Sequence, residues 1–216
     1  NSLKTMSEVI LEVSGVGQKR IASLYGPSHA EEVLKGFPTT LVAASIDKKT
    51  SVLVQDIFSS DVLRVYSNND LKGVELGGSL KNVIAIATGI CDGIGFGDNT
   101  KAALLTRGLA EITRLGTLMG AKESTFSGLS GIGDLIATCL SDHSRNRHVG
   151  EEIGKGKSLS TILENMDMVA EGVKTTQSVH DLSKKYNLDM PISEGVYKIL
   201  FENKNPKSIV SELMNR

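Results

Sequence analysis

The chain has 216 residues, of which 40% are hydrophobic, 23% charged and 4% aromatic, and it contains no tryptophan. This composition predicts a folded core built from aliphatic side chains. The formal net charge of −1 excludes the broad basic surface with which proteins hold nucleic acid, although a local cluster could still bind a small anion.

Two cysteines, Cys91 and Cys139, lie in apolar segments without a partner at metal-ligand spacing. We therefore expect buried thiols, no metal site and a reducing, cytoplasmic setting. The sequence carries no signal peptide and no apolar run of the ~18 residues that a membrane span needs, so no membrane span is expected. Asn1 opens in the middle of a pattern, which favours a fragment or a cleaved product.

The first part of the chain alternates between strand and helix patterns up to about residue 68. Apolar periodicity and glycine or proline breaks predict a helix over 6–13, a strand over 21–25, a helix over 28–35, a strand over 38–46, a helix over 48–59 and a strand over 62–66. Ser28 is the expected cap of the helix over 28–35. This alternation is typical of an α/β arrangement, which we assign to residues 1–68.

From residue 69 onward the strand patterns end. Helices are expected over 70–90, 98–120, 132–140, 145–153, 159–164, 172–186, 194–201 and 207–214, with Ser144, Ser158, Ser193 and Pro206 at four of the starts. In the helix over 98–120, a charged ladder is expected on a face other than the apolar one, formed by Arg107, Glu111 and Arg114. The chain is therefore predicted to be mainly α, with an all-helical domain over residues 69–216.

Lys81 lies inside the first of these helices, one turn after Gly77 and Gly78. A glycine in a helix interior costs about 1 kcal/mol relative to alanine, so the pair indicates that something approaches the backbone closely. A stripe of small and polar residues runs along the same helix through Gly78, Lys81, Asn82, Ala85 and Gly89. A lysine on this stripe would be partly desolvated and could donate or accept a proton. The alternative is a lysine that extends to solvent beside glycines that serve helix packing.

Three further segments have the character of ligand-binding turns. In 142–148, Ser144 is a good cap and Arg145 follows it, and a helix start with an arginine suits phosphate. The alternative there is an ordinary capped helix with a solvated basic face. A tight glycine turn over 128–133 delivers Asp134 to a helix start, where the acid either caps the helix or orients a lysine. Gly26-Pro27-Ser28 offers amides and a hydroxyl where a strand turns into a helix.

The glycine pattern of a dinucleotide-binding loop is missing from this sequence. Gly15-Val16-Gly17 and Gly93-Ile94-Gly95-Phe96-Gly97 do not have the GxGxxG spacing, and neither joins a clear strand to a helix. The four histidines are expected to be surface or packing residues, since they form no metal or catalytic pattern: His29, His143, His148 and His180.

A series of short motifs runs through essentially the whole chain in a fixed order. They include Gly26-Pro27-Ser28, Leu80-Lys81-Asn82, Gly97-Asp98-Asn99, Gly131-Ile132-Gly133-Asp134, Ser144-Arg145-Asn146-Arg147, Glu171-Gly172 and Met190-Pro191-Ile192. In these motifs and their order the chain resembles the bacterial-type NAD(P)-dependent glycerol-3-phosphate dehydrogenases. The resemblance implies that residues 1–68 are the C-terminal remnant of a Rossmann-like cofactor domain and that residues 69–216 form the substrate and catalytic domain. The missing glycine fingerprint would then precede residue 1.

The resemblance also implies the ligands and partners of the chain. The cofactor would be NAD or NADP, and the substrates sn-glycerol 3-phosphate and dihydroxyacetone phosphate. A homodimer and a place in glycerophospholipid synthesis are implied as well. On this basis the expected activity is that of an oxidoreductase, although this chain alone could be inactive.

Site roles follow from the resemblance residue by residue. Lys81 would be the catalytic proton donor and acceptor, with Asp134 as the acid that keeps it charged and aimed. The implied substrate contacts are Gly26, Ser28, Lys81, Asp134, Ser144, Arg145 and Asn146, and the implied cofactor contacts are Ala30, Arg145, Val169 and Glu171. Two alternatives stay open, namely a related hydroxyacid dehydrogenase and a non-catalytic helical module for dimerisation or phosphate binding.

Overall fold

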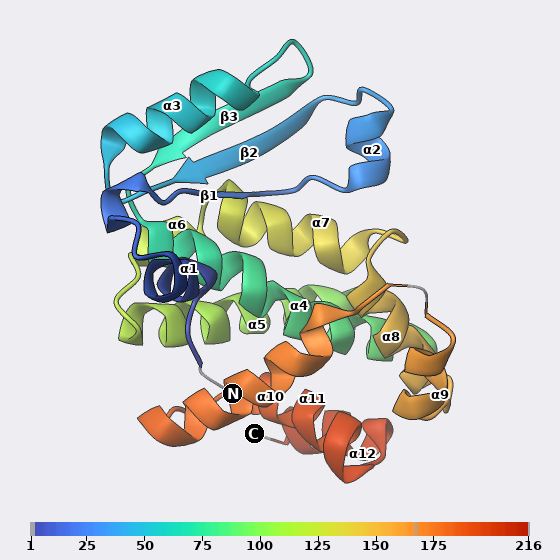
Figure 1. The fold of residues 1–216 in the computed structure, drawn as a ribbon. Coiled ribbons are helices and arrows are strands. Elements are labelled where there is room, and N and C mark those ends of the chain that lie inside the picture. Colours follow the sequence, from blue (N-terminus) through green and yellow to red (C-terminus); the bar gives the residue numbers. More distant parts are fainter. Residues whose placement is uncertain (1–2, 167, 216) are drawn as a thin grey trace. The chain divides into compact units, whose positions relative to one another are not determined.

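The computed structural model describes residues 3–166 and 168–215 (Figure 1). The elements in chain order are α1 (Met6–Ser14), β1 (Ser23–Tyr25), α2 (Ala30–Leu34), β2 (Thr39–Ala44), α3 (Lys48–Phe58), β3 (Leu63–Asn68), α4 (Leu71–Ile94), α5 (Asp98–Leu118), α6 (Glu123–Phe126), α7 (Asp134–Leu140), α8 (Arg145–Gly154), α9 (Leu159–Glu164), α10 (Glu171–Tyr186), α11 (Pro191–Glu202) and α12 (Pro206–Met214). A 3₁₀ turn (Gln18–Arg20) precedes β1, and a π-helical turn (Leu129–Gly133) precedes α7. The prediction of a mainly α chain that opens with an α/β portion is confirmed.

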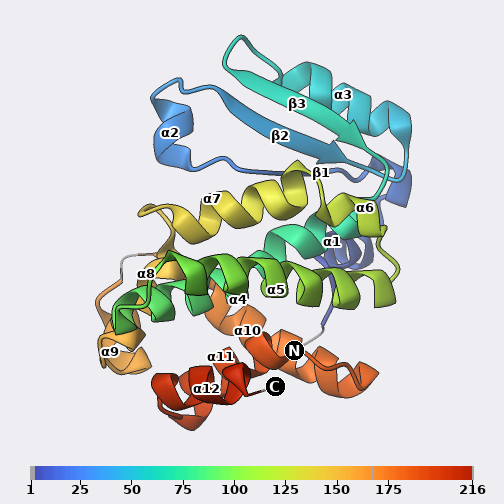
Figure 2. The ribbon, with the colours of Figure 1, turned by 180° about the vertical axis from the view of Figure 1, so that it is seen from behind.

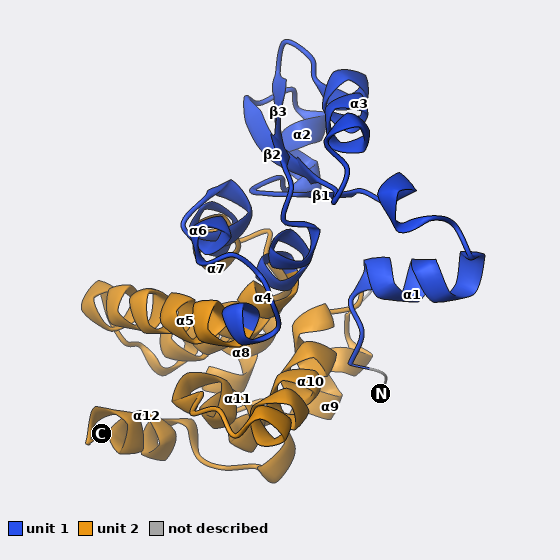
Figure 3. Cartoon of the chain, turned by 90° about the vertical axis from the view of Figure 1, so that its left-hand side faces the viewer, with its two compact units in different colours: residues 1–78, 116–135 blue, residues 79–115, 136–216 orange. Residues whose placement is uncertain are grey.

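The chain divides into two compact units, which Figure 3 shows in different colours. Unit 1 comprises residues 1–78 and 116–135, and unit 2 comprises residues 79–115 and 136–216. The division passes through α4, so the helix that carries Lys81 starts in unit 1 and continues in unit 2.

Unit 1 contains the sheet, in the order β1-β2-β3. β1 pairs with β2 in antiparallel fashion, and β2 pairs with β3 in parallel, from Thr39 opposite Leu63 to Ala44 opposite Asn68. The parallel pair is joined by α3, which begins where the Asp47 carboxylate accepts a hydrogen bond from the Thr50 amide at 3.1 Å. Figures 1 and 2 show α3 lying along one face of the sheet.

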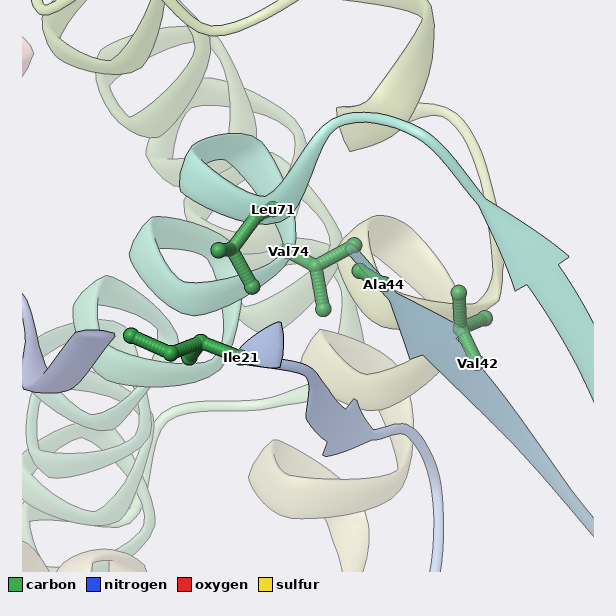
Figure 4. Packing of buried hydrophobic residues seen from close by; sticks show 5 residues of the cluster. All are labelled: Ile21, Val42, Ala44, Leu71 and Val74. Atoms are coloured by element: carbon green, nitrogen blue, oxygen red, sulfur yellow. The ribbon is translucent and has the colours of Figure 1, made fainter. Parts of the chain in front are cut away.

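The core of unit 1 follows the two-residue period of β2, whose side chains point alternately to the two faces of the sheet. On one face, Val42 and Ala44 pack with Ile21, Leu71 and Val74 (Figure 4). On the other face, the buried cluster consists of Leu41, Ala43 and Val65, with Val54 of α3 packed against it. Both faces of β2 are therefore covered by apolar side chains.

A buried carboxylate ties α1 to α4 in unit 1. Glu75 is 3% exposed and accepts hydrogen bonds from the Ser7 amide at 2.9 Å, the Ser7 hydroxyl at 2.5 Å and the Ser23 hydroxyl at 3.1 Å. Ser7 lies in the first turn of α1, where free amides and the helix dipole favour a negative charge.

In unit 2, α8 packs on α4 at a distance that only glycines allow. A Cβ at Gly89 would overlap the carbonyl of Arg147, and a Cβ at Gly150 would overlap the carbonyl of Ile86. A Cβ at Gly154 would lie 2.5 Å from the carbonyl oxygen of Ile90. The two backbones are thus in direct contact, which sets the position of α8 relative to the helix that carries Lys81.

The expected ladder of Arg107, Glu111 and Arg114 is wrong for its central residue. Glu111 is 1% exposed, and its carboxylate accepts hydrogen bonds from the Ile192 amide at 2.6 Å, the Ser193 amide at 3.0 Å and the Ser193 hydroxyl at 2.8 Å. The side chain therefore serves the first turn of α11, about eighty residues away, and does not form part of a surface ladder.

Several expected helix boundaries shift for local reasons. Ser28 does not cap α2, because its hydroxyl donates to the Gly26 carbonyl at 3.2 Å and the helix starts after His29. α11 starts at Pro191, three residues before the expected start, since proline fits the first turn of a helix. The caps expected at Ser144 and Ser158 are confirmed, with hydroxyl-to-amide distances of 3.2 Å at each.

Two other expectations concern the apolar segments. Cys91 and Cys139 are free and buried, as expected. α4, however, includes an 18-residue window with a mean hydropathy of 1.2, so by length and composition it could cross a membrane. The expected absence of such a run is therefore wrong by this measure. Within the structure 83% of the window is buried, which is typical of a helix in a protein core.

Candidate functional site

The start of α8 gathers three of the expected site residues in unit 2. Ser144 is its cap and is 5% exposed, and its hydroxyl accepts a hydrogen bond from the Arg147 amide at 3.2 Å. Helix geometry leaves the amides of Arg145 and Asn146 without intrahelical acceptors. The start of α8 thus combines a neutral cap, two amide donors and one guanidinium, which suits an anion.

Asn146 joins the start of α8 to the start of α10. Its side-chain oxygen accepts a hydrogen bond from the Gly172 amide at 2.8 Å, and Asn146 is 5% exposed. A Cβ at Gly172 would lie 2.6 Å from this oxygen and 2.9 Å from the backbone carbonyl oxygen of Asn82. Asn82 directly follows Lys81 on α4, so the Asn146–Gly172 contact is built against the turn of helix that bears the lysine.

Arg145 forms a second link to α10. Its guanidinium lies 3.3 Å from the carboxylate of Glu171, and the two side chains are 39% and 54% exposed. Val169, two residues before Glu171, is 63% exposed. The structure therefore brings together three of the four expected cofactor contacts, namely Arg145, Val169 and Glu171, on an accessible edge of unit 2.

Arg147, the second arginine of the segment, is engaged within the protein. Its guanidinium bonds to the Asp92 carboxylate through two nitrogens, each at 2.9 Å, and to the Asp142 carboxylate at 2.7 Å. Lys101 also reaches Asp92, at 3.2 Å. Arg147 therefore holds α8 to the end of α4, which leaves Arg145 as the arginine placed for a ligand.

Lys81 is half-buried on α4. The stripe of small and polar residues on which it lies contacts two different parts of unit 2 along its length. Gly89 serves the α4–α8 packing, as the alternative interpretation held, whereas Lys81 itself adjoins the Asn146–Gly172 contact through Asn82. The packing use of Gly89 is thus shown, and the role of Lys81 stays a prediction.

In unit 1, the turn after β1 contains three expected site residues: Gly26, Ser28 and Ala30. Gly26 has φ of +152° and is buried against β2, where a Cβ would lie 2.9 Å from the Thr40 carbonyl oxygen. Ser28 is half-buried, and Ala30 is exposed at the first position of α2. The glycine is thus required by the fold, while Ser28 and Ala30 are accessible.

The groups that lie close to Gly77 and Gly78 are one backbone carbonyl and one aromatic side chain, from two segments of unit 1. A Cβ at Gly77 would lie 2.6 Å from the carbonyl oxygen of Ser130, in the π-helical turn. A Cβ at Gly78 would overlap the aromatic ring of Tyr25, the last residue of β1. No sequence pattern predicts a site role for Tyr25, because a single aromatic residue at the end of a strand is common in folded proteins.

Asp134 is the first residue of α7 and is 2% exposed. Its backbone is helical, with φ of −70° and ψ of −32°, so it lies inside the first turn and does not have the extended backbone of a cap. Burial raises the pKa of the Tyr25 phenol, and the charges of Glu75 and Asp134 raise it further.

Two family models match the chain. The model described as "NAD-dependent glycerol-3-phosphate dehydrogenase C-terminus" matches residues 70–211, and the model described as "NAD-dependent glycerol-3-phosphate dehydrogenase N-terminus" matches residues 1–51. The first match alone covers more than half of the chain.

Curated relatives match over the full chain. A glycerol-3-phosphate dehydrogenase [NAD(P)+] of Salinibacter ruber is 58% identical over 216 residues, and one of Oceanobacillus iheyensis is 56% identical over 215 residues. The chain spans 63% and 62% of the lengths of these two relatives.

Solved structures of glycerol-3-phosphate dehydrogenases also superpose on the chain. The crystal structure of glycerol-3-phosphate dehydrogenase from Coxiella burnetii is 39% identical and superposes with a TM-score of 0.95, over 100% of this chain and 66% of that one. The glycerol-3-phosphate dehydrogenase of Plasmodium falciparum is 25% identical with a TM-score of 0.90, over 100% of this chain and 62% of that one.

Proposed function

The chain belongs to the NAD-dependent glycerol-3-phosphate dehydrogenase family, and from this premise we propose that it is the substrate-holding part of an NAD(P)-dependent oxidoreductase. The reaction interconverts sn-glycerol 3-phosphate and dihydroxyacetone phosphate. One observation within unit 2 carries the assignment of the site. The start of α8, with its free amides and Arg145, is tied through Asn146 and Gly172 to the turn of α4 beside Lys81.

This reaction places two demands on the protein. The phosphate end of the substrate must be anchored so that the other end is positioned, and a cationic acid must meet the oxygen on which negative charge develops. When bound, the nicotinamide cofactor supplies or takes the hydride at the neighbouring carbon.

Lys81 serves the reacting oxygen. In reduction its ammonium group donates a proton to the oxygen of dihydroxyacetone phosphate as the alkoxide forms, and in oxidation its amine accepts the proton of the alcohol. In unit 1, Asp134 is buried at the start of α7, and it is proposed as the second residue of the chemistry because it stands in the motif Gly131-Ile132-Gly133-Asp134.

The start of α8 binds the phosphate end of the substrate. The Arg145 guanidinium and the first amides of the helix supply charged and neutral donors to the phosphate oxygens. Asn146 commits its side-chain oxygen to Gly172, so its amide nitrogen is the end that donates to a substrate oxygen. Within unit 1, Gly26 and Ser28 are proposed as substrate contacts in their own right, through a backbone amide and a hydroxyl.

The residues assigned to the cofactor fit the edge of a dinucleotide. Arg145 and Glu171 form an accessible charged pair, and Val169 presents an exposed apolar side chain beside them. Together they offer polar groups for an amide or a phosphate and an apolar surface for a ring. Ala30, exposed at the start of α2, is the corresponding contact of unit 1.

Replacement of Lys81 tests the proposal, in the full-length protein, since this chain spans 63% of its relative in Salinibacter ruber. We expect Lys81→Ala to lower kcat about 100- to 1000-fold, because the oxygen loses both its proton donor and its positive charge. The thermal midpoint should stay unchanged. Steady-state reduction of dihydroxyacetone phosphate with NADH and with NADPH measures the effect and also the cofactor preference.

Lys72→Ala is the matched control, since Lys72 lies on the same helix and forms an exposed ion pair with Glu8 at 3.0 Å. It should leave kcat unchanged. Near-normal turnover of Lys81→Ala would remove the lysine from the chemistry. If the wild type bound neither NADH nor dihydroxyacetone phosphate in calorimetry, the interpretation as a non-catalytic helical module would replace that of an enzyme.

The proposal also covers the cellular location, the oligomeric state and the pathway of the enzyme. We propose a cytoplasmic homodimer whose product feeds glycerophospholipid synthesis. Sedimentation equilibrium of the full-length protein measures the oligomeric state, and a mass equal to one chain would contradict the dimer.

A further inference from the structure

Tyr25 occupies a place in unit 1 between the two segments to which we assign substrate contacts. It is the last residue of β1, directly before Gly26 and three residues before the accessible Ser28. Its ring lies against α4 at Gly78, while the carbonyl of Ser130, four residues before Asp134, lies against the neighbouring Gly77. Two consecutive glycines of α4 therefore bring the end of β1 and the approach to α7 side by side.

The ring of Tyr25 is packed against other side chains, and its hydroxyl is able to bond to a ligand. The ring packs against the apolar cluster that contains Ile21, Val42 and Val74, and it covers Gly78, where no side chain could be accommodated. The residue as a whole is half-buried. Within the part of the chain that the structure describes, the phenolic hydroxyl forms no hydrogen bond with a protein group. A tyrosine with a packed ring and a hydroxyl that bonds to no protein group can place one donor in a binding site.

The electrostatic surroundings define what this hydroxyl can do. Burial and the nearby carboxylates Glu75 and Asp134 raise the pKa of the phenol above its ordinary value of about 10. The hydroxyl therefore keeps its proton throughout the physiological range and acts as a donor, not as a base. An oxygen of a phosphorylated three-carbon substrate is an acceptor for such a donor.

We propose that Tyr25 is a substrate-binding residue, whose hydroxyl donates a hydrogen bond to an oxygen of the phosphorylated triose held by the Gly26–Ser28 turn and Asp134. This inference rests on the proposed function. The hydroxyl contributes to binding and takes no part in the transfer of hydride or proton, so its loss raises KM for the triose and leaves kcat close to its original value.

Tyr25→Phe in the full-length protein tests this role, because it removes the hydroxyl and keeps the ring on Gly78. We expect KM for dihydroxyacetone phosphate to rise about 3- to 10-fold, as for the loss of one neutral hydrogen bond. KM for NADH and the thermal midpoint should stay unchanged. Tyr66→Phe is the matched control, since Tyr66 is 45% exposed on β3, and it should alter none of these quantities.

Each other outcome overturns the inference. Unchanged KM values in Tyr25→Phe would make Tyr25 a packing residue only. A lower thermal midpoint with a general loss of kcat would also assign it a structural role, because a binding role moves KM for the triose alone. If the wild-type protein did not reduce dihydroxyacetone phosphate at all, the proposed function would fail first and this inference with it, which distinguishes the two failures.

Discussion

The helices α8 and α11 of unit 2 begin in opposite electrostatic surroundings. At α11, the buried carboxylate of Glu111 accepts the amides of Ile192 and Ser193. At α8, the cap is the neutral hydroxyl of Ser144. Both are ordinary ways to satisfy the free amides of a helix start, yet only one of them brings a negative charge.

The difference teaches where an external anion can bind. The positive end of the α11 dipole already faces a carboxylate of the protein, which is 1% exposed. The cap of α8 is the neutral hydroxyl of Ser144, and Arg145 beside it, which pairs with the exposed Glu171 carboxylate at 3.3 Å, has a side chain that is 39% exposed. At α11 the first amides already bond to a side chain of the protein, whereas a neutrally capped start beside an arginine remains a place for a ligand.

Among the variants at the two helix starts, Arg145→Ala should cause the largest change in substrate binding. We expect KM for dihydroxyacetone phosphate to rise about 10- to 100-fold, because a hydrogen bond to a charged group contributes roughly 1.5–3 kcal/mol. Steady-state kinetics of the full-length protein measures it. Arg107→Ala, at an exposed position of α5, is the control and should behave as wild type. A change confined to the cofactor constant would place Arg145 on the cofactor side alone.

Glu111→Gln should affect stability and leave substrate binding unchanged. We expect the free energy of unfolding to fall by roughly 1–3 kcal/mol, since an amide with one oxygen cannot accept from both Ile192 and Ser193 as the carboxylate does. Chemical denaturation measures this loss. Glu202→Gln, exposed at the end of the same α11, should lose almost nothing. A raised KM in Glu111→Gln would contradict the contrast between the two helix starts.

The pH dependence of this loss follows from the direction of the shift. Burial raises the pKa of the Glu111 carboxyl, and the hydrogen bonds from Ile192 and Ser193 oppose the rise. The folded state therefore holds the proton more tightly than the unfolded state, whose pKa is about 4.3. The contribution of Glu111 is full below that value and is lost as the pH rises through the raised folded pKa. The stability difference between wild type and Glu111→Gln should narrow from pH 4 upward, and a widening difference would contradict the assignment.

Ser144→Ala should have the smallest effect on stability. Loss of a serine cap costs about 1 kcal/mol. Ser158→Ala is a close match, because Ser158 caps α9 with the same hydroxyl-to-amide distance of 3.2 Å. Both variants should lose similar stability, but only Ser144→Ala should also raise KM for the substrate. Equal kinetics in the two variants would reduce Ser144 to an ordinary cap.

Much of the fold follows from patterns within a few residues. The caps at Ser144 and Ser158, the strand pattern around β2 and the breaks at glycine and proline depend on interactions that span one turn or one strand. The boundaries that shift, such as the early start of α11, lie where a proline permits an earlier first turn. Ser28 resembles a cap in sequence, but its hydroxyl bonds back to Gly26, a choice that local pattern does not reveal.

The candidate site is predictable to a smaller degree. The order of the motifs predicts Lys81, Asp134 and the segment at Ser144 as site residues, whereas their spacing alone leaves a structural interpretation open. Tyr25 and the engagement of Arg147 by Asp92 could not be found in this way. In both cases the contacting residue is distant in the sequence, and the identity of one side chain does not predict which distant residue it will contact.

The sequence by itself determined the helical and α/β segments, the caps of α8 and α9 and, through its ordered motifs, the family. Only the tertiary structure decided that Glu111 fills the start of α11, that Gly78 makes room for Tyr25, and that Gly89 brings the backbones of α4 and α8 together. The physical reason is range. Propensity and capping act between neighbours in the chain, whereas burial of a carboxylate or close packing at a glycine depends on residues that meet only after the chain has folded.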